Sequence, residues 1–145
     1  MKADDGLRKL LHTHLPRSAG FLWTAVETGG THNGVPDSHW VNANTRSSGW
    51  IESKATDGWA VEVRPHQVSW IVPRVAAGER VTIAIRAKGK GSADGRGDSL
   101  WLVRGSAVKE LQELGLKLPG WAILGIWYGP PKEWDWAAVS AIITG

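Results

Sequence analysis

Two acids and a lysine are spaced in this sequence in a way that suits divalent-metal chemistry on phosphodiesters. Asp37 follows a proline, and Glu52 lies two residues before Lys54, with fourteen residues separating the two acids. Mg²⁺ takes oxygen ligands in octahedral geometry and keeps several waters, so one or two carboxylates plus substrate phosphate oxygens suffice. Asp37 and Glu52 would supply those carboxylates, and the Ser53 backbone carbonyl is a further candidate ligand. Lys54 would place a positive charge where it steadies the attacking water or the pentacoordinate phosphate.

The two acids meet only if the chain between them turns back on itself. Residues 38–41 and 50–54 favour strands, whereas residues 42–49 hold the Asn, Thr, Ser and Gly that are typical of a turn. Such a hairpin brings Asp37, at the start of its first strand, close to Lys54, at the end of its second.

Alternation along the second strand decides which side chains face the site. Successive side chains of a strand point to opposite faces. Glu52 and Lys54 are therefore expected on one face, while Ile51 and Ser53 point the other way into an apolar layer. The strand thus presents an acid and a lysine together.

The ordered motifs resemble those of the PD-(D/E)XK nuclease superfamily. Pro36-Asp37 matches the first half of that signature, and Glu52-Ser53-Lys54 matches the second. The chain is similar, more narrowly, to small phage nucleases related to VRR-NUC domains and to archaeal-type Holliday-junction resolvases. Gly34-Val35-Pro36-Asp37 matches their G-[IV]-P-D segment, and Gln67-Val68-Ser69-Trp70 matches a Q-x-x-aromatic motif on the following helix. The resemblance covers about residues 5–86.

This resemblance implies an α/β fold with a restriction-endonuclease-like core, a central mixed β-sheet flanked by helices in the order αβββαβ. It also implies a Mg²⁺-dependent DNA endonuclease, with Mn²⁺ substituting, that is selective for branched DNA and leaves 5′-phosphate ends. Asp37 and Glu52 would then bind metal and Lys54 would assist the nucleophile. Gln67 would bond the catalytic water, Lys54 or a phosphate. Glu27 stands where the family often carries another acid. It is either a metal or water ligand or a plain acid at the end of a strand.

Two polar loops flank the predicted site. Glycines let the backbone approach a phosphate closely, so the loop at 29–34 either touches DNA or is only a tight connection. The basic loop at 88–98 is either a phosphate-contacting arm or a mobile linker. The candidate DNA contacts are Thr31, His32, Asn33, Arg46, Arg64, Lys88, Lys90 and Arg96.

The remaining periodic segments alternate between helix and strand. Helices are predicted over 3–15, 107–114 and 134–143, and strands over 21–28, 79–87 and 100–104. A further helix opens at Pro65, and Pro73 should end or kink it before Gly78. Glycines and prolines argue against one continuous helix over 118–128.

Composition indicates a single globular domain. The 145 residues are 42% hydrophobic and 21% charged, with no cysteine for a disulfide or a thiolate metal site. No apolar run is long enough to span a bilayer and no signal-peptide pattern is present, so a cytoplasmic protein without membrane contact is expected, in a phage-infected bacterial host. The net charge of +3 is compatible with a DNA partner.

Ten tryptophans are the oddest feature of the composition. Tryptophan fills cores, anchors interfaces or stacks on unpaired bases. The four between Trp121 and Trp136 lie in a Trp-rich C-terminal extension, about residues 100–145, and should cover the sheet or a partner subunit. A homodimer is therefore predicted.

Two other functions stay open from the sequence. The first is a catalytically silent nuclease-like module that binds DNA as an accessory factor. The second is a nuclease that acts on RNA or in defence or anti-defence. The chain shows no zinc finger or helix-turn-helix pattern, which favours recognition of nucleic-acid shape over stringent sequence recognition.

Overall fold

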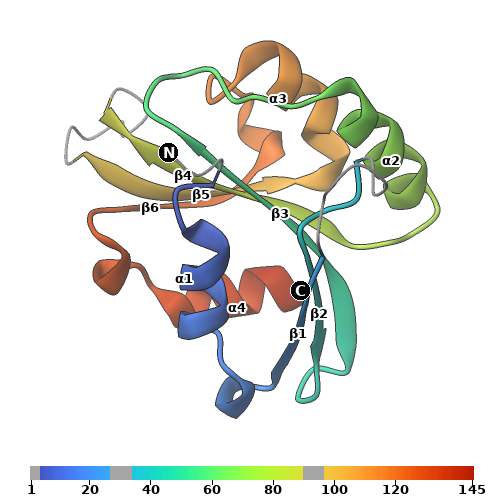
Figure 1. The fold of residues 1–145 in the computed structure, drawn as a ribbon, viewed down its shortest axis with the longest axis vertical. Helices are drawn as coiled ribbons and strands as arrows, with labels where there is room; N and C mark the ends of the chain where they lie inside the picture. The colour runs from blue at the N-terminus through green and yellow to red at the C-terminus, as the bar shows by residue number, and fades with distance from the viewer. Residues whose placement is uncertain (1–3, 27–33, 90–96) are drawn as a thin grey trace.

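A six-stranded mixed sheet forms the centre of the protein (Figure 1). The computed structural model describes residues 4–26, 34–89 and 97–145. The strands lie side by side in chain order, and only β3 and β4 run parallel to each other. The strands are β1 (Phe21–Ala25), β2 (Ser38–Asn42), β3 (Ser47–Thr56), β4 (Val81–Lys88), β5 (Asp98–Arg104) and β6 (Ile123–Tyr128).

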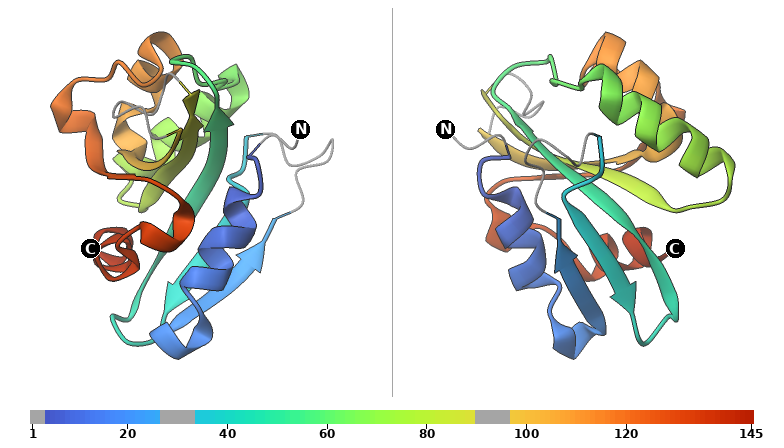
Figure 2. Two further views of the ribbon diagram at one scale, coloured as in Figure 1. Left: turned by 90° about the vertical axis from the view of Figure 1, so that its left-hand side faces the viewer. Right: turned by 45° about the vertical axis from the view of Figure 1, so that its right-hand side comes forward.

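Helices cover both faces of the sheet. Figures 1 and 2 show α2 (Pro65–Ala76) and α3 (Val108–Leu114) above the sheet, and α1 (Leu7–His14) and α4 (Trp136–Thr144) below it. The parallel β3–β4 pair needs a crossover, and α2 provides it. These observations confirm the predicted α/β class with a mixed sheet between helices. The elements from α1 to β4 also follow the predicted chain order, whereas the restriction-endonuclease-like assignment stays a prediction.

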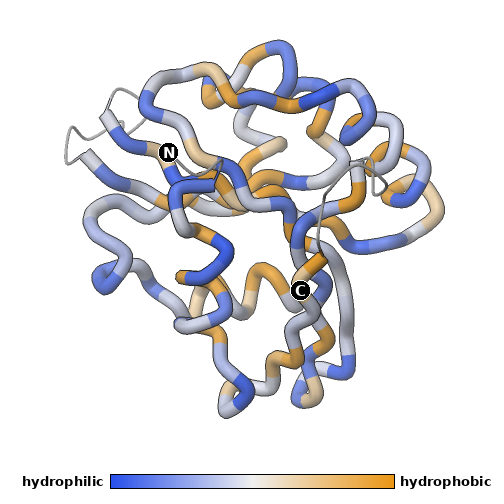
Figure 3. The backbone as a smooth tube through the Cα atoms, viewed as in Figure 1, coloured by the Kyte–Doolittle hydropathy of each residue, from blue (hydrophilic) through white to orange (hydrophobic). Residues whose placement is uncertain are grey.

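Each face of the sheet has its own hydrophobic core, because β4 and β5 are apolar on both sides. In β4, Ile83 and Ile85 face α2 and α3, whereas Ala84 faces α1 and α4. The core under α1 and α4 includes Trp40 and Ile51 of the central hairpin, both fully buried. Hydrophobic residues concentrate along the central strands in Figure 3, and the turns at the rim are mostly hydrophilic.

Several element boundaries differ from the sequence expectations by a few residues. β3 begins at Ser47, since residues 47–49 pair with β2 instead of belonging to the turn, which is reduced to residues 43–46. The helix opened by Pro65 ends at Ala76, before Gly78 as expected, but it continues past Pro73. Proline removes one backbone hydrogen bond from a helix, and here that loss falls near the C-terminal end, where the helix continues for only three more residues.

The tryptophans of the C-terminal segment mostly cover the chain's own sheet. Trp134 is buried, and its indole N–H donates to the Gly129 carbonyl at 2.8 Å. Trp127 and Trp136 pack against the core under α1 and α4, while Trp121 is 54% exposed. The expected cover over the sheet is therefore present for three of the four. Among the described residues, no helix is long and apolar enough to cross a membrane.

Candidate active site

The β2–β3 hairpin brings the two predicted acids together. Ser38 pairs with Ile51, so Asp37 and Glu52 are neighbours across the hairpin. The backbone N–H of Asp37 donates to Glu52 Oε1 at 3.2 Å, and the backbone N–H of Ser53 donates to Asp37 Oδ2 at 3.0 Å. Each acid therefore accepts a hydrogen bond from the other acid's strand.

One carboxylate oxygen of this pair has no partner among the described residues. Asp37 Oδ1 is buried and accepts no hydrogen bond from them, and Glu52 is only 8% exposed. Buried polar atoms are nearly always hydrogen-bonded, so an orphan oxygen beside a second buried acid calls for an explanation. Mg²⁺ prefers such oxygen ligands. The donor set therefore fits a divalent cation held by Asp37 and Glu52.

Lys54 and Gln67 complete the cluster from β3 and α2. Lys54 Nζ lies 3.7 Å from Glu52 Oε2 and donates to Gln67 Oε1 at 2.7 Å. The Gln67 amide Nε2 donates to Glu52 Oε2 at 3.2 Å. Glu52 and Lys54 thus lie on one face, as alternation predicts, and Ile51 lies in the opposite core. The motif resemblance implied the catalytic water, Lys54 or a phosphate as the partner of Gln67, and the structure shows the hydrogen bond with Lys54.

Gln67 is held in place by the start of its own helix. Pro65 opens α2, and Gln67 Oε1 also accepts the backbone N–H of Arg64 at 3.0 Å, which caps the helix. One side chain therefore joins the helix N-terminus to the lysine and to the acid.

Burial shifts the pKa values of all three ionisable groups toward their neutral forms. Burial raises the pKa of Asp37 to about 6, although the Ser53 N–H opposes this rise. Burial, together with the charge of Asp37, raises the pKa of Glu52 to about 7. Burial also lowers the pKa of Lys54, and the Glu52 carboxylate offsets part of that effect. Two close buried acids cannot both ionise cheaply without a compensating positive charge.

The structure also places two N-terminal charges near Asp37 that the sequence did not single out. The charge of Asp4 raises the pKa of Asp37 and the charge of Arg8 lowers it. Asp4 accepts backbone N–H bonds from Gly6 and Arg8, so it caps α1. The helical pattern locates this cap, but no local signal shows that the helix starts beside the hairpin.

Gly34 shapes the path into the site. Its φ is +83°, and a Cβ on it would overlap the His66 carbonyl oxygen near the start of α2. The glycine therefore lets the segment before Asp37 pack directly on α2. In the sequence, the G-V-P-D match was the sign that a glycine is needed at position 34.

The other predicted site residues are spread over different places. Arg64 is exposed at the start of α2, near Lys54, whose pKa its charge lowers. Lys88 is 2.6 Å from Asp5 in an ion pair. Arg46 lies at the far end of the hairpin, six residues or roughly 20 Å of strand from Glu52, so the structure does not bring it to the site.

Several predictions fall outside the described residues. These are Glu27, Thr31, His32, Asn33, Lys90 and Arg96. Within the described ranges, no group of three or more His, Asp or Glu side chains is placed to hold a metal. The candidate site offers two carboxylates, and the Ser53 carbonyl stays a predicted third ligand.

No protein-family model matches the chain, and neither curated proteins nor solved structures give a match. The similarity to PD-(D/E)XK nucleases therefore stays a prediction that depends on the motifs and on the geometry of the Asp37–Glu52 pair.

Proposed function

We propose that this protein is a Mg²⁺-dependent endonuclease, with Mn²⁺ able to substitute, that hydrolyses phosphodiester bonds of DNA. The observation that carries the proposal is the buried Asp37–Glu52 pair, in which Asp37 Oδ1 has no hydrogen-bond partner within residues 4–26, 34–89 and 97–145. Such a pair favours a cation because both acids are costly to ionise without one. Bound Mg²⁺ would supply Lewis-acid stabilisation of charge on the phosphate oxygens.

The chain's own residues then have separate roles. Asp37 and Glu52 hold the cation, and Lys54 presents its ammonium to the phosphate on the same face. Gln67 fixes the positions of Glu52 and Lys54 through its two hydrogen bonds. In the proposed hydrolysis, a water oxygen bonds to phosphorus and the bond to the 3′-oxygen breaks. The products are a 5′-phosphate, which keeps the water's oxygen, and a 3′-hydroxyl, which takes one of the water's protons.

The finer parts of the proposal come from the motif resemblance and from the charge. Branched DNA is the proposed substrate, and a homodimer in the cytoplasm of a phage-infected bacterium is the proposed working form. The net charge of +3 suits a polyanionic partner.

A cleavage panel tests the proposal. Branched, single-stranded and duplex DNA, with RNA alongside, are incubated with Mg²⁺, Mn²⁺ or EDTA. We expect cleavage of DNA that needs the metal and stops with EDTA. Asp37→Ala and Glu52→Ala should abolish it while the circular-dichroism spectrum stays that of the wild type. Full cleavage by folded Asp37→Ala would refute the site. DNA binding without cleavage would indicate the silent accessory module. Cleavage of RNA but not of DNA would indicate an RNA nuclease.

A further inference from the structure

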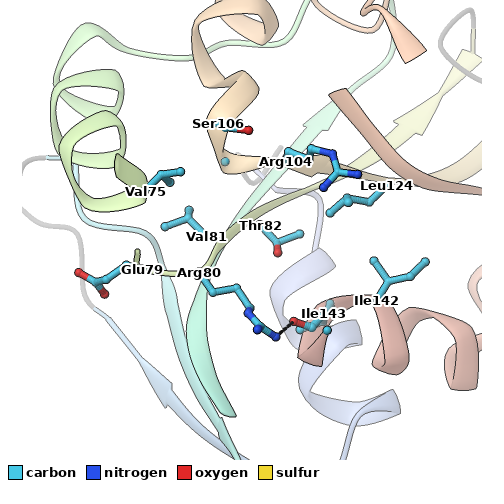
Figure 4. Close-up of a pocket in the computed structure, with 12 residues that line it drawn as sticks. Val75, Glu79, Arg80, Val81, Thr82, Arg104, Ser106, Leu124, Ile142 and Ile143 are labelled. Atoms are coloured by element: carbon cyan, nitrogen blue, oxygen red, sulfur yellow. Dashed lines mark hydrogen bonds between the residues drawn. The ribbon is translucent and has the colours of Figure 1, made fainter. Parts of the chain in front are cut away.

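A second polar cluster lies beside the C-terminal end of α2, away from the candidate active site. A cavity of about 240 Å³ opens there between the start of β4, the end of β5 and α4 (Figure 4). Val75 lines it, eight residues or about 12 Å of helix from Gln67. The polar groups that line it include Arg80, Thr82 and Arg104.

The two arginines form no close ion pair with an acid of the described residues. Arg80 donates through Nη1 to the Ile143 and Thr144 carbonyls, and Arg104 donates through Nε to the Trp121 carbonyl at 2.8 Å. Among the described residues, no carboxylate lies within 4.0 Å of either guanidinium. An arginine has five N–H donors in a planar fork, so both retain donors for an anion.

Glu79 does not neutralise the cavity, although it lines part of it. Its carboxylate accepts from Arg74 at 2.6 Å and from the Trp50 indole at 2.7 Å. Figure 4 shows the Glu79 side chain pointing away from the two arginines. The charged side chains that face the cavity are therefore the two arginines.

Thr82 adds a hydroxyl between the arginines. The residue is only 3% exposed and lines the cavity. Figure 4 places it between Arg80 and Arg104. A threonine hydroxyl can both donate and accept a hydrogen bond, so it can bind an anion held by the arginines.

The rest of the lining and the volume limit the kind of ligand. The other walls include the aliphatic side chains of Val81, Leu124 and Ile142. At about 240 Å³ the cavity is smaller than the usual pockets for cofactors and nucleotides, so it suits a small ligand.

We propose that this cavity binds a small oxyanion, a carboxylate or a phosphate ester, carried on a short aliphatic body. The Arg104 and Arg80 forks and the Thr82 hydroxyl bind the oxyanion, and the aliphatic walls bind the body. The proposal is independent of the nuclease function, since neither the acids nor Lys54 take part.

Titrations followed by two-dimensional ¹H–¹⁵N NMR test it with four probes. Hexanoate and butyl phosphate carry both features, 1-hexanol has the body without the charge, and inorganic phosphate has the charge without the body. We expect saturable shifts at the amides of Thr82 and Ser106 and at the Arg104 side-chain N–H with the first two. The neutral alcohol and inorganic phosphate should bind at least about tenfold more weakly. The tighter of hexanoate and butyl phosphate identifies the oxyanion.

Variants separate a built site from general surface charge. Arg104→Gln and Thr82→Val should each weaken hexanoate binding, by about tenfold or more for the arginine, because hydrogen bonds to charged groups are strong. Arg17→Gln removes an arginine from the turn after α1 and should leave binding unchanged. Equal binding of 1-hexanol, equal binding of inorganic phosphate, no saturable shift at millimolar concentration, or unchanged binding in both cavity variants would overturn the proposal.

Discussion

Asp37 and Glu52 are buried acids whose oxygen atoms are unequally satisfied. Glu52 accepts from the Asp37 N–H and from Gln67, whereas one oxygen of Asp37 has no partner in the part of the chain that the structure describes. Hydrogen bonds that favour the charged form compete with burial, and for both acids burial is the larger effect. The cluster is therefore costly on its own and would gain from a cation.

Stability should report this cost through pH. The ordinary pKa values are 3.8 for Asp37 and 4.5 for Glu52, and the folded values are about 6 and about 7. The folded protein thus binds more protons than the unfolded chain between about pH 4 and pH 7. The free energy of unfolding should fall as pH rises through this window when metal is absent.

Asp37→Asn tests this pH dependence. It removes one buried charge and the repulsion that raises the pKa of Glu52. In EDTA we expect the variant to match the wild type near pH 4 and to exceed it by roughly 1–3 kcal/mol at pH 8. Urea denaturation at both values measures the difference. Added Mg²⁺ should stabilise the wild type at pH 8 but not the variant. A wild type whose stability is flat between pH 4 and pH 8 would contradict the prediction.

Lys54→Ala should affect rate more than metal affinity. An ammonium is no ligand for a cation, and removing one preorganised electrostatic group commonly costs about 10²–10³ in rate. Single-turnover cleavage measures the rate, and calorimetry with Mn²⁺ measures the affinity. Lost metal binding with unchanged chemistry would show that the assigned role is wrong. Lys109→Ala, an exposed lysine on α3, is the control and should change neither quantity.

At the scale of elements, local sequence signals predicted the features that depend on residues close together in the chain, namely the strands and the hairpin. Strand alternation placed Glu52 with Lys54, and the hairpin brought Asp37 to them. Contacts between distant segments were not predictable in this way. The approach of Asp4 to Asp37 depends on where α1 docks, and the Lys88–Asp5 ion pair joins the end of β4 to the segment before α1. No local pattern specifies such packing.

Strand β6 shows a second limit of local signals. Residues 118–128 are apolar and interrupted by Gly120 and Gly125, which excluded one continuous helix. The structure resolves the segment into a short 3₁₀ turn and an edge strand paired with β5. An apolar run of this length does not by itself distinguish a strand from other buried segments.

Gly34→Ala should damage the site through the packing of the hairpin on α2. The positive φ strains any other residue, and a Cβ would meet the His66 carbonyl, which is backbone and cannot move aside cheaply. We expect a loss of at least 1 kcal/mol in the free energy of unfolding and a drop in metal affinity. Gly78→Ala, which also has positive φ but nothing within 4 Å of the added Cβ, is the matched control. Metal affinity lost equally in both variants would contradict the packing explanation.

At the scale of the whole molecule, the segment after residue 100 shares a core with the motif-bearing part. Leu100, Trp134 and Val139 belong to the same buried cluster as Leu7 and Phe21. The Trp-rich extension therefore packs in the same core as α1. This packing accounts for most of the extension's tryptophans without requiring a partner subunit.

The proposed homodimer depends on what this packing leaves exposed. Trp121 is 54% exposed on the turn before β6, and exposed apolar surface often marks an interface. A symmetric pair of sites would suit paired cuts on a branched duplex. We expect light scattering at micromolar concentration to give twice 15.7 kDa, and Trp121→Ala to shift the mass toward the monomer. Leu22→Ala, at an exposed position on β1, should leave the dimer intact. An active protein of 15.7 kDa would end the proposal, and dissociation by Leu22→Ala alone would move the interface to the β1 edge.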